Sequence, residues 1–326
     1  MTGDVLDIRN LSLRFESQQG AVHALRNIDM TVPRGEIVGV VGESGSGKST
    51  LALAIMRLLS GNAVISSGTI GFCGSDLLKL PEDDMRAIRG TRISMVFQDP
   101  MTSLNPVRSI GAQMADIQYR DRTASAAQKR RKSGAALQRV GIPDADSQLD
   151  RYPFQFSGGM RQRIAIAMSL LQKPELLIAD EVTTALDVTL EAQILHLLRE
   201  LRKDINGSIL FISHNLGAIA EICDRVVVLY AGEVVESGLV GDIFNRPLHP
   251  YTKALIACDP ARIEKATREL PVIAGDVPNL HSVPDACIFA PRCAVAIDRC
   301  HTTRPADVLA GPEHRARCHL VAGARP

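Results

Sequence analysis

Short apolar runs, separated by polar and glycine-rich segments, predict the strands of an α/β fold. Residues 5–15 alternate between apolar and polar positions in their second half, which is typical of a half-exposed strand. Further strands are predicted at 37–41, 68–72, 93–97, 176–181 and 208–212. Helical patterns follow at 48 to about 59, twice within 101–140, and at 164–171.

The segment between the strand at 37–41 and the helix from residue 48 reads GESGSGKS and fits the phosphate-loop pattern GxxxxGKS without a mismatch. Its glycines let successive backbone N–H groups point at one spot, and the helix that begins there favours an anion. Lys48 would add a charge for the β- and γ-phosphates, and the hydroxyl of Ser49 would ligate magnesium. A glycine-rich turn with a chance lysine is the weaker interpretation, because strand, loop and helix follow in the required order.

Polar residues stand at the ends of three predicted strands. Gln98 could bind magnesium, orient a water or simply cap its strand. Asp180 fits the magnesium-holding aspartate of phosphate-loop enzymes, and Glu181 could act beyond the metal as a general base. His214 is favoured as a contact for the γ-phosphate.

Phe15 could stack on an adenine face or be an ordinary core residue, and its spacing does not decide between the two.

A second anion-binding helix terminus is predicted at 156–163, which reads FSGGMRQR and opens the helix at 164–171. One nucleotide rarely needs two phosphate sites, so this terminus would serve a nucleotide held by a partner chain. The helical segment before it is rich in Lys and Arg, but aromatic residues are not interleaved with them beyond Tyr119. A solvated helix face is therefore favoured over a nucleic-acid surface.

Composition narrows the class of protein further. The 326 residues are 45% hydrophobic and carry a net charge of +1, so they allow a large domain with a smaller one and give no reason to expect a polyanionic partner. The sequence has no run of about 18 apolar residues and no signal-peptide pattern at its start. We expect a cytosolic protein whose cysteines stay reduced or bind metal.

Four cysteines gather in the proline-rich end of the chain, at 287, 293, 300 and 318. The usual paired spacing of zinc ligands is missing, and ligation by cysteine alone at wider gaps suits an iron–sulfur cluster. Zinc, or no metal, remains an alternative. The other three cysteines, Cys73, Cys223 and Cys258, are expected to be small core residues.

The whole set of motifs resembles ABC-type ATPases, and specifically the D-type ATP-binding subunits of oligopeptide, dipeptide or nickel permeases. The resemblance covers nearly the whole chain. It rests on QDPMTSLNP at 98–106, FSGGMRQR at 156–163, ALD at 185–187 and RPLHPYT at 246–252.

The resemblance implies a role for each matching residue. Gln98 would sense the γ-phosphate and help to hold magnesium with Ser49 and Asp180, Glu181 would be the catalytic base, and His214 the switch histidine. The remaining nucleotide-binding residues implied are Phe15, Gly42, Ser44, Gly45, Gly47, Lys48, Thr50, Ser157, Gly158, Gly159, Gln162 and Asp187.

The resemblance also implies the architecture. An ABC ATPase domain at 1–258 would combine a phosphate-loop mixed sheet and its helices with a helical signature subdomain at about 99–172. A C-terminal extension at 259–326 would hold a 4Fe-4S cluster on Cys287, Cys293, Cys300 and Cys318, with APRC at 290–293 as part of the match. Zinc is the alternative metal.

The implied function is ATP hydrolysis that powers a multi-subunit importer of oligo- or dipeptides. Its partners would be a second, paralogous ATPase subunit, two transmembrane permease subunits and an extracytoplasmic solute-binding protein, without nucleic acid. The protein would lie peripherally on the cytoplasmic face of the inner membrane. Met101 and Leu104, apolar residues of a loop, are expected to contact a permease subunit.

Three alternatives stay open. The solute could be nickel or another small molecule. The chain could be a regulatory ATP-binding subunit beside a catalytic paralogue, because Val182 and Asn215 replace the Pro and Asp usual in the family. Phe154 also departs from the family, which usually has a His before the signature. A soluble ABC ATPase that acts on nucleic acid or ribosomes is less favoured, since the chain has one cassette and no room for a long coiled coil.

Overall fold

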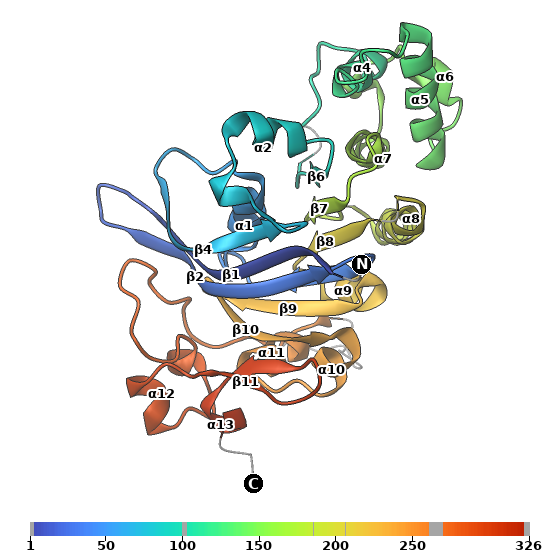
Figure 1. Ribbon diagram of the computed structural model, residues 1–326. Coiled ribbons are helices and arrows are strands. Elements are labelled where there is room, and N and C mark those ends of the chain that lie inside the picture. The colour runs from blue at the N-terminus through green and yellow to red at the C-terminus, as the bar shows by residue number, and fades with distance from the viewer. Residues whose placement is uncertain (1–2, 100–102, 185, 206, 261–269, 323–326) are drawn as a thin grey trace. The chain divides into compact units, whose positions relative to one another are not determined.

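The computed structural model describes residues 3–99, 103–184, 186–205, 207–260 and 270–322 (Figure 1). The chain divides into two compact units. We call residues 1–79 with 211–326 the core unit and residues 80–210 the helical unit, and we describe each by itself. The division predicted from sequence, at 258/259, is a different one and remains a prediction.

The core unit begins with an antiparallel sheet in the order β2 (Val22–Pro33), β1 (Asp4–Phe15), β4 (Ala63–Phe72) and β5 (Ser75–Asp76) (Figure 1). Leu6 and Ile8 are buried, and so are Leu11 and Leu13, although the spacing from Ile8 to Leu11 breaks the period of two. A bulge lies between them, where Asn10 has a φ of 48°. The extra residue keeps the apolar side chains of both halves on the same face.

A second group of strands in the core unit carries the phosphate loop. β3 (Ile37–Val41) is buried throughout and pairs in parallel with β9 (Arg225–Tyr230). β9 is followed by an antiparallel series of β10 (Glu233–Leu239), β12 (Arg315–Arg317) and β11 (Asp307–Leu309). Helices α1 (Lys48–Met56), α9 (Leu216–Ile222), α10 (Val240–Asn245) and α11 (Pro250–Ala257) complete this part. β8 (Ser208–Ile212) contains the boundary between the two units.

The helical unit contains a parallel pair of strands, β6 (Ile93–Val96) and β7 (Leu176–Asp180). Its helices are α2 (Glu82–Ile88), α4 (Ile110–Ile117), α5 (Ala126–Arg139), α6 (Ala145–Gln148), α7 (Gly158–Leu170) and α8 (Val188–Ile205). Serine side chains begin three of them: Ser109, Ser125 and Ser157 each accept the N–H of the residue three positions on. These N-caps satisfy backbone donors that a helix cannot satisfy internally.

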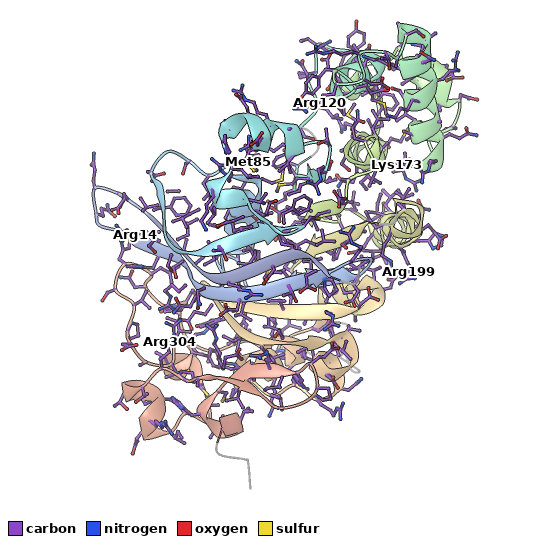
Figure 2. All side chains as sticks on the ribbon, viewed as in Figure 1. Arg14, Met85, Arg120, Lys173, Arg199 and Arg304 are labelled. Atoms are coloured by element: carbon purple, nitrogen blue, oxygen red, sulfur yellow. The ribbon has the colours of Figure 1, made fainter. Side chains whose placement is uncertain are left out.

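The basic segment of the helical unit is largely exposed, which the predicted solvated helix face requires. Arg120, labelled in Figure 2, is exposed, as are Arg131 and Lys132 on α5. Arg130 makes two hydrogen bonds of 2.8 Å to the carboxylate of Asp150. Ser133 belongs to the buried face of α5 and receives a hydrogen bond from the Gln118 amide. The helix is therefore amphipathic, with its cations turned to water.

The predicted strands are confirmed, whereas several boundaries move for local reasons. The helix that follows the phosphate loop ends at Met56 rather than near residue 59, because Arg57 adopts a left-handed φ of 49°. The signature helix begins at Gly158 rather than 164, because the cap is Ser157. The strand predicted at 68–72 extends back to Ala63.

We call residues 259–326 the C-terminal segment. Its described parts are short elements: a 3₁₀ turn at Ala290–Arg292, α12 (Asp298–Thr302) and α13 (His319–Ala322), besides β11 and β12. Phe289 packs against Tyr230 and Tyr251, with ring centroids 5.2 and 5.4 Å apart. This aromatic contact attaches the segment to β9 and α11. Among the described residues, no helix combines the length and apolar character needed to cross a bilayer.

His249, buried at the start of α11, generates a prediction about pH. Its Nδ1 accepts the N–H of Tyr251 at 3.0 Å, and burial lowers the pKa of its imidazole to about 3. The ordinary pKa is about 6.5, so between these values the unfolded chain binds a proton that the folded chain does not. We expect His249 to lower the free energy of unfolding by up to about 1.4 kcal/mol per pH unit as pH falls below 6.5.

Nuclear magnetic resonance of ¹⁵N-labelled histidines checks this directly. The His249 ring should remain neutral at pH 5, because burial lowers the pKa of its imidazole to about 3. Replacement by Gln should make the decline of stability between pH 6.5 and 4.5 shallower. A His249 ring that is protonated at pH 6 would contradict the assignment.

Candidate nucleotide-binding site

The phosphate loop follows the buried strand β3 in the core unit. Gly45 and Gly47 have φ values of 76° and 103°, which L-residues with side chains rarely adopt. Gly42 has no room for a side chain, because a Cβ there would lie 2.1 Å from the carbonyl oxygen of Leu229 on β9. The backbone path of the loop is therefore fixed by glycine conformations and by close packing on the neighbouring strand.

Lys48 lies at the start of α1 and is buried. Its Nζ donates hydrogen bonds to the carbonyl oxygens of Gly42 (2.8 Å) and Glu43 (3.0 Å). The ammonium is thus held inside the curve of the loop, where it can meet an anion. Ser44 and Ser49 are exposed, and Thr50 is half-buried.

His214 and Phe15 are the other predicted site residues of the core unit. The N–H of Ser213 donates to the carbonyl of Val40 at 3.2 Å, so His214, which is exposed, follows a residue bonded to the strand that leads into the loop. Phe15 ends β1 opposite Val22 and Ala63 and is half-buried. A partly accessible ring is compatible with stacking and is not the environment of a fully buried core residue.

The helical unit brings Gln98 and Glu181 together. Val96 on β6 and Ala179 on β7 are paired in register, and each candidate residue stands two positions beyond. The Nε2 of Gln98 donates to Oε2 of Glu181 at 2.8 Å. Asp180, the last residue of β7, is buried. Parallel strands that end at one edge explain why residues 83 positions apart meet.

Glu181 has a φ of 50°, an uncommon conformation for a residue with a side chain. Such conformations cluster at functional sites. The N–H of Thr184 donates to the carbonyl of Glu181 at 3.1 Å, and its hydroxyl donates to Oε2 at 3.3 Å. Val182, which stands where the family usually has Pro, is buried. The turn is closed by these hydrogen bonds and by burial, so Val182 does not leave it loose.

The signature motif forms the N-terminus of α7. Ser157 accepts the N–H of Met160 at 3.3 Å, and it is exposed together with Gly158. Gly159 and Gln162 are buried, and a Cβ on Gly159 would lie 3.0 Å from the Leu190 side chain. Ser157 and Gly158 are therefore the exposed part of the motif that is open to a ligand.

Two further positions were singled out from the sequence, one on each side of this motif. Asp187 accepts the N–H of Leu190 at 2.9 Å, so its carboxylate caps the start of α8. Phe154 is exposed and stacks on Tyr152, with ring centroids 5.8 Å apart.

The segment expected to contact a permease needs a correction. Met101 lies outside the described residues. Leu104 is only 3% exposed, so the prediction that it faces a partner is wrong; Val107 is the apolar residue turned outward, at 79% exposure. Sequence alone did not distinguish them, because both are apolar residues in the same polar stretch.

The four C-terminal cysteines come together in the core unit. The N–H of Cys287 donates to the carbonyl of Cys300 at 3.0 Å. Burial raises the pKa of Cys287 to about 11 and that of Cys293 above its usual value, and the neighbouring thiols of Cys300 and Cys318 add to both shifts. Within the described ranges, however, no three His, Cys, Asp or Glu side chains are arranged to hold a metal ion. The thiols thus influence one another electrostatically, but the described side chains do not form a metal site.

The other cysteines are only partly as expected. Cys223 is a buried core residue. Cys73 is half-buried and has a φ of 47°, in a turn completed by Gly74, and Cys258 is a half-buried residue at the end of α11. The prediction of a core position is therefore wrong for these two.

Sequence reasoning missed three contributions to the loop and its surroundings. Asn215 is the N-cap of α9 and accepts the N–H of Ala218 at 3.2 Å, a role that a carboxylate could equally fill. Tyr251 and Arg292 contact Glu43 in the phosphate loop. Both belong to segments that matched a family pattern, RPLHPYT and APRC, but nothing in the pattern specified their contact.

A phosphate loop after a buried parallel strand, with carboxylates and a glutamine at the ends of other parallel strands, defines the class of phosphate-loop ATPases. Comparisons with known proteins identify the family. A family model described as ABC transporter matches residues 25–184, and one described as oligopeptide/dipeptide transporter, C-terminal region, matches residues 235–300.

Similar proteins extend over nearly the whole chain. The probable D,D-dipeptide transport ATP-binding protein DdpD of Escherichia coli is 46% identical, covering 98% of this chain and 96% of its own length. The dipeptide transport protein DppD of Bacillus subtilis is 44% identical over 97% and 94%, and the oligopeptide transport protein OppD of Salmonella typhimurium 43% over 96% and 92%. The chain belongs to the ATP-binding subunits of the ABC transporter family.

Solved structures agree on the fold. The dimeric ATP-binding cassette MJ0796, in a post-hydrolysis state bound to ADP and Pi, superimposes with a TM-score of 0.65 at 25% identity, over 72% of this chain and 98% of that one. CbiO1 of Clostridium perfringens gives a TM-score of 0.63 at 28% identity, over 74% and 91%. The predicted ABC ATPase fold is confirmed.

The cap at Asn215 provides a test of the site's local structure. Replacement by Ala should lower the free energy of unfolding by about 1 kcal/mol, because the first turn of α9 loses an acceptor. Replacement by Asp should not, since a carboxylate caps equally well and favours the helix N-terminus. Urea denaturation of both variants measures this, and equal stability of the Ala variant and the original chain would contradict the capping role.

Proposed function

We propose that this protein is an ATP-hydrolysing subunit that powers an importer of oligo- or dipeptides. The observation that carries the proposal is its similarity, at 43% to 46% identity, to proteins named for dipeptide and oligopeptide transport, over 96% to 98% of the chain. The C-terminal match to the oligopeptide/dipeptide transporter region supports the same class of solute. Import of nickel or another small solute is the alternative.

The core unit would bind the triphosphate. Backbone N–H groups between Gly42 and Thr50, other than that of Glu43, which donates to Tyr251, would surround the β- and γ-phosphates. The Lys48 ammonium, already held at the loop, would neutralise part of their charge. Phe15 would stack on the adenine, and His214 would contact the γ-phosphate. The positive φ values of Gly45 and Gly47 support this use of the loop, since they allow its N–H groups to converge.

The helical unit would supply the chemistry. Glu181 would take a proton from the water that attacks the γ-phosphate, and Gln98, hydrogen-bonded to that carboxylate, would fix its direction. When magnesium is bound with ATP it neutralises phosphate charge, and the hydroxyl of Ser49, the Gln98 amide and the buried Asp180 are the residues that would hold it. The presence of Glu181 and His214 favours a hydrolysing subunit over a purely regulatory one.

A second ATPase subunit would complete each nucleotide site. Ser157 and Gly158 are exposed at a helix N-terminus, which is suited to a phosphate held by another chain. Gly159 and Gln162 would support that terminus from behind, and Asp187 would lie at the same junction. We propose a paralogous partner, two permease subunits and an extracytoplasmic binding protein, with this chain peripheral to the cytoplasmic face of the membrane.

The catalytic proposal predicts a separation of binding from turnover. Replacement of Glu181 by Gln should leave ATP binding intact and slow hydrolysis about 10²-fold or more in the assembled transporter, because the general base is lost. Replacement of Lys48 by Ala should weaken binding itself. ATP affinity and phosphate release measured on the same preparations distinguish the two effects.

A matched control uses the other end of β7, where Glu175 pairs with Arg92 at 2.6 Å. Glu175→Gln removes a carboxylate directly before the first residue of β7, at the end opposite Glu181. This variant should hydrolyse ATP at the normal rate. Normal turnover by the Glu181→Gln variant would show that Glu181 is not the base.

We also propose that the four clustered cysteines bind a 4Fe-4S cluster that holds the C-terminal segment, with zinc as the alternative. Their gathering in one place supports the proposal, although the described side chains do not themselves form a metal site. Bound metal would reverse the raised thiol pKa values, since thiolates are the ligands. Anaerobically purified protein should contain iron and acid-labile sulfide, and Cys293→Ser with Cys300→Ser should lose both. Stoichiometric zinc without iron would contradict the cluster.

A further inference from the structure

Glu43 is the first variable residue of the phosphate loop, and its N–H, its carbonyl and its carboxylate each have a hydrogen-bond partner. Its N–H donates to the hydroxyl of Tyr251 at 2.9 Å, and its carbonyl accepts the Lys48 ammonium at 3.0 Å. Its carboxylate accepts two hydrogen bonds from the guanidinium of Arg292, at 2.7 and 3.1 Å. Two of the three partners come from beyond residue 250, far along the chain from the loop that they hold.

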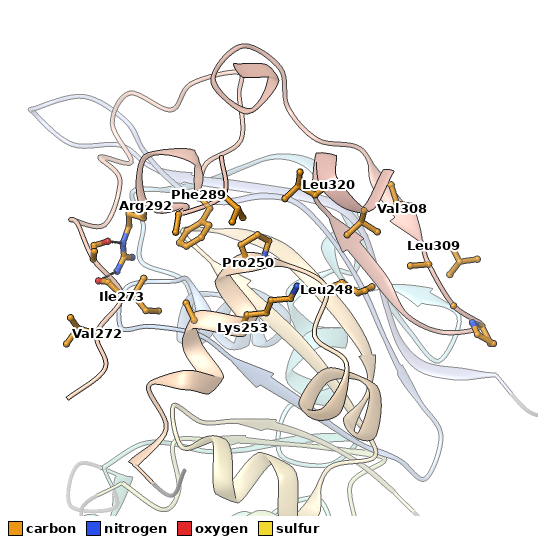
Figure 3. A pocket seen from close by; sticks show the side chains of 18 residues that line it. Leu248, Pro250, Lys253, Val272, Ile273, Phe289, Arg292, Val308, Leu309 and Leu320 are labelled. Atoms are coloured by element: carbon orange, nitrogen blue, oxygen red, sulfur yellow. Dashed lines mark hydrogen bonds between the residues drawn. The ribbon is translucent and has the colours of Figure 1, made fainter. Parts of the chain in front are cut away.

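Arg292 is itself held rigidly. Its side chain is only 4% exposed. Beyond Glu43, the guanidinium donates at 2.9 Å to the carbonyls of Ile273 and Ala274, and at 3.4 Å to the hydroxyl of Tyr230. Figure 3 shows Arg292 beside Phe289 and Ile273, at one end of an apolar pocket of about 1170 Å³. The hydrogen bonds to Glu43 raise the pKa of Arg292 further, so its charge is permanent.

The contact between Arg292 and Glu43 connects the C-terminal segment, which carries the four cysteines, to the phosphate loop. Arg292 ends the 3₁₀ turn that follows Phe289, and Cys293 is the next residue. Tyr251 belongs to α11, and its ring lies 4.5 Å from that of Tyr230 and 5.4 Å from that of Phe289. The aromatic cluster of Tyr230, Tyr251 and Phe289 therefore supports both side chains that hydrogen-bond to Glu43.

We propose that Arg292 and Tyr251 are positioning residues for the phosphate loop, through which the C-terminal segment sets the affinity for ATP. The proposal rests on the proposed binding of ATP at this loop. Two physical effects support it. The carbonyls of Gly42 and Glu43 hold Lys48, so a rotation of this peptide would move the ammonium. Arg292 also neutralises the Glu43 carboxylate, which would otherwise repel the triphosphate.

The electrostatic part of the proposal makes a distinctive prediction about paired substitutions. In the full-length chain, Arg292→Ala should weaken MgATP binding by about tenfold, within the range usual for coupling between sites. Arg292→Lys should weaken it less, because one charge remains without the two-pronged geometry. Glu43→Gln in the Arg292→Ala background should recover much of the lost affinity, since the unpaired negative charge is removed.

Tyr251→Phe tests the positioning part separately. It removes only the hydroxyl that accepts the Glu43 N–H, and the aromatic cluster keeps its rings. We expect weaker MgATP binding by about threefold, as for the loss of one hydrogen bond. Glu313→Gln is the matched control: Glu313 pairs with Arg225 at 2.9 Å and attaches the same C-terminal segment at the other end of β9. The control should bind MgATP as the original chain does.

Coupling is reciprocal, so ATP must also stabilise the docked segment. Hydrogen exchange should show greater protection of residues 287–293 on addition of MgATP, and this gain should be lost in Arg292→Ala.

Three results would overturn the inference. The first is unchanged affinity in both Arg292→Ala and Tyr251→Phe. The second is a loss in Arg292→Ala that Glu43→Gln does not relieve, as expected if the segment had merely unfolded. The third is protection by MgATP that is the same with and without Arg292. If the original chain fails to bind MgATP at all, the proposed nucleotide site is wrong instead.

Discussion

The close contact between Gly42 and the carbonyl of Leu229 is the constraint on which the core unit depends. It fixes where the phosphate loop leaves β3, since no side chain fits between the loop and β9. The left-handed glycines then turn the loop back to begin α1, and Lys48 is held by the carbonyls at the start of the turn. Position, curvature and charge of the loop thus follow from packing on one neighbouring strand and from glycine's conformational freedom.

The helical unit reaches its functional arrangement by a different route. Here the register of two parallel strands sets Gln98 beside Glu181. Glu181 itself has a left-handed φ, and its hydrogen bond with the Thr184 hydroxyl directs its carboxylate. The phosphate loop and the pair Gln98–Glu181 are therefore organised by separate local causes in separate units.

Local patterns in the sequence were sufficient for much of the fold, and they also pointed to the candidate site residues. The phosphate loop, the strand-end carboxylates and the signature serine are all read within a few residues. Burial was harder: Leu104 and Val107 have the same character, yet only one faces water. Contacts such as Glu43 with Arg292 were out of reach, because 249 residues separate them and their meeting depends on the folded C-terminal segment.

We expect this chain to recognise its nucleotide by the phosphates, through the loop whose glycines and Lys48 are already in place. Calorimetric titration of the full-length protein with MgATP, MgADP, AMP and adenosine tests it most directly. ATP and ADP should bind with similar, measurable affinity, whereas AMP and adenosine should bind at least about a hundredfold more weakly, because the loop has no β-phosphate to hold. Equal binding of AMP and ATP would contradict the account and point to recognition of the base.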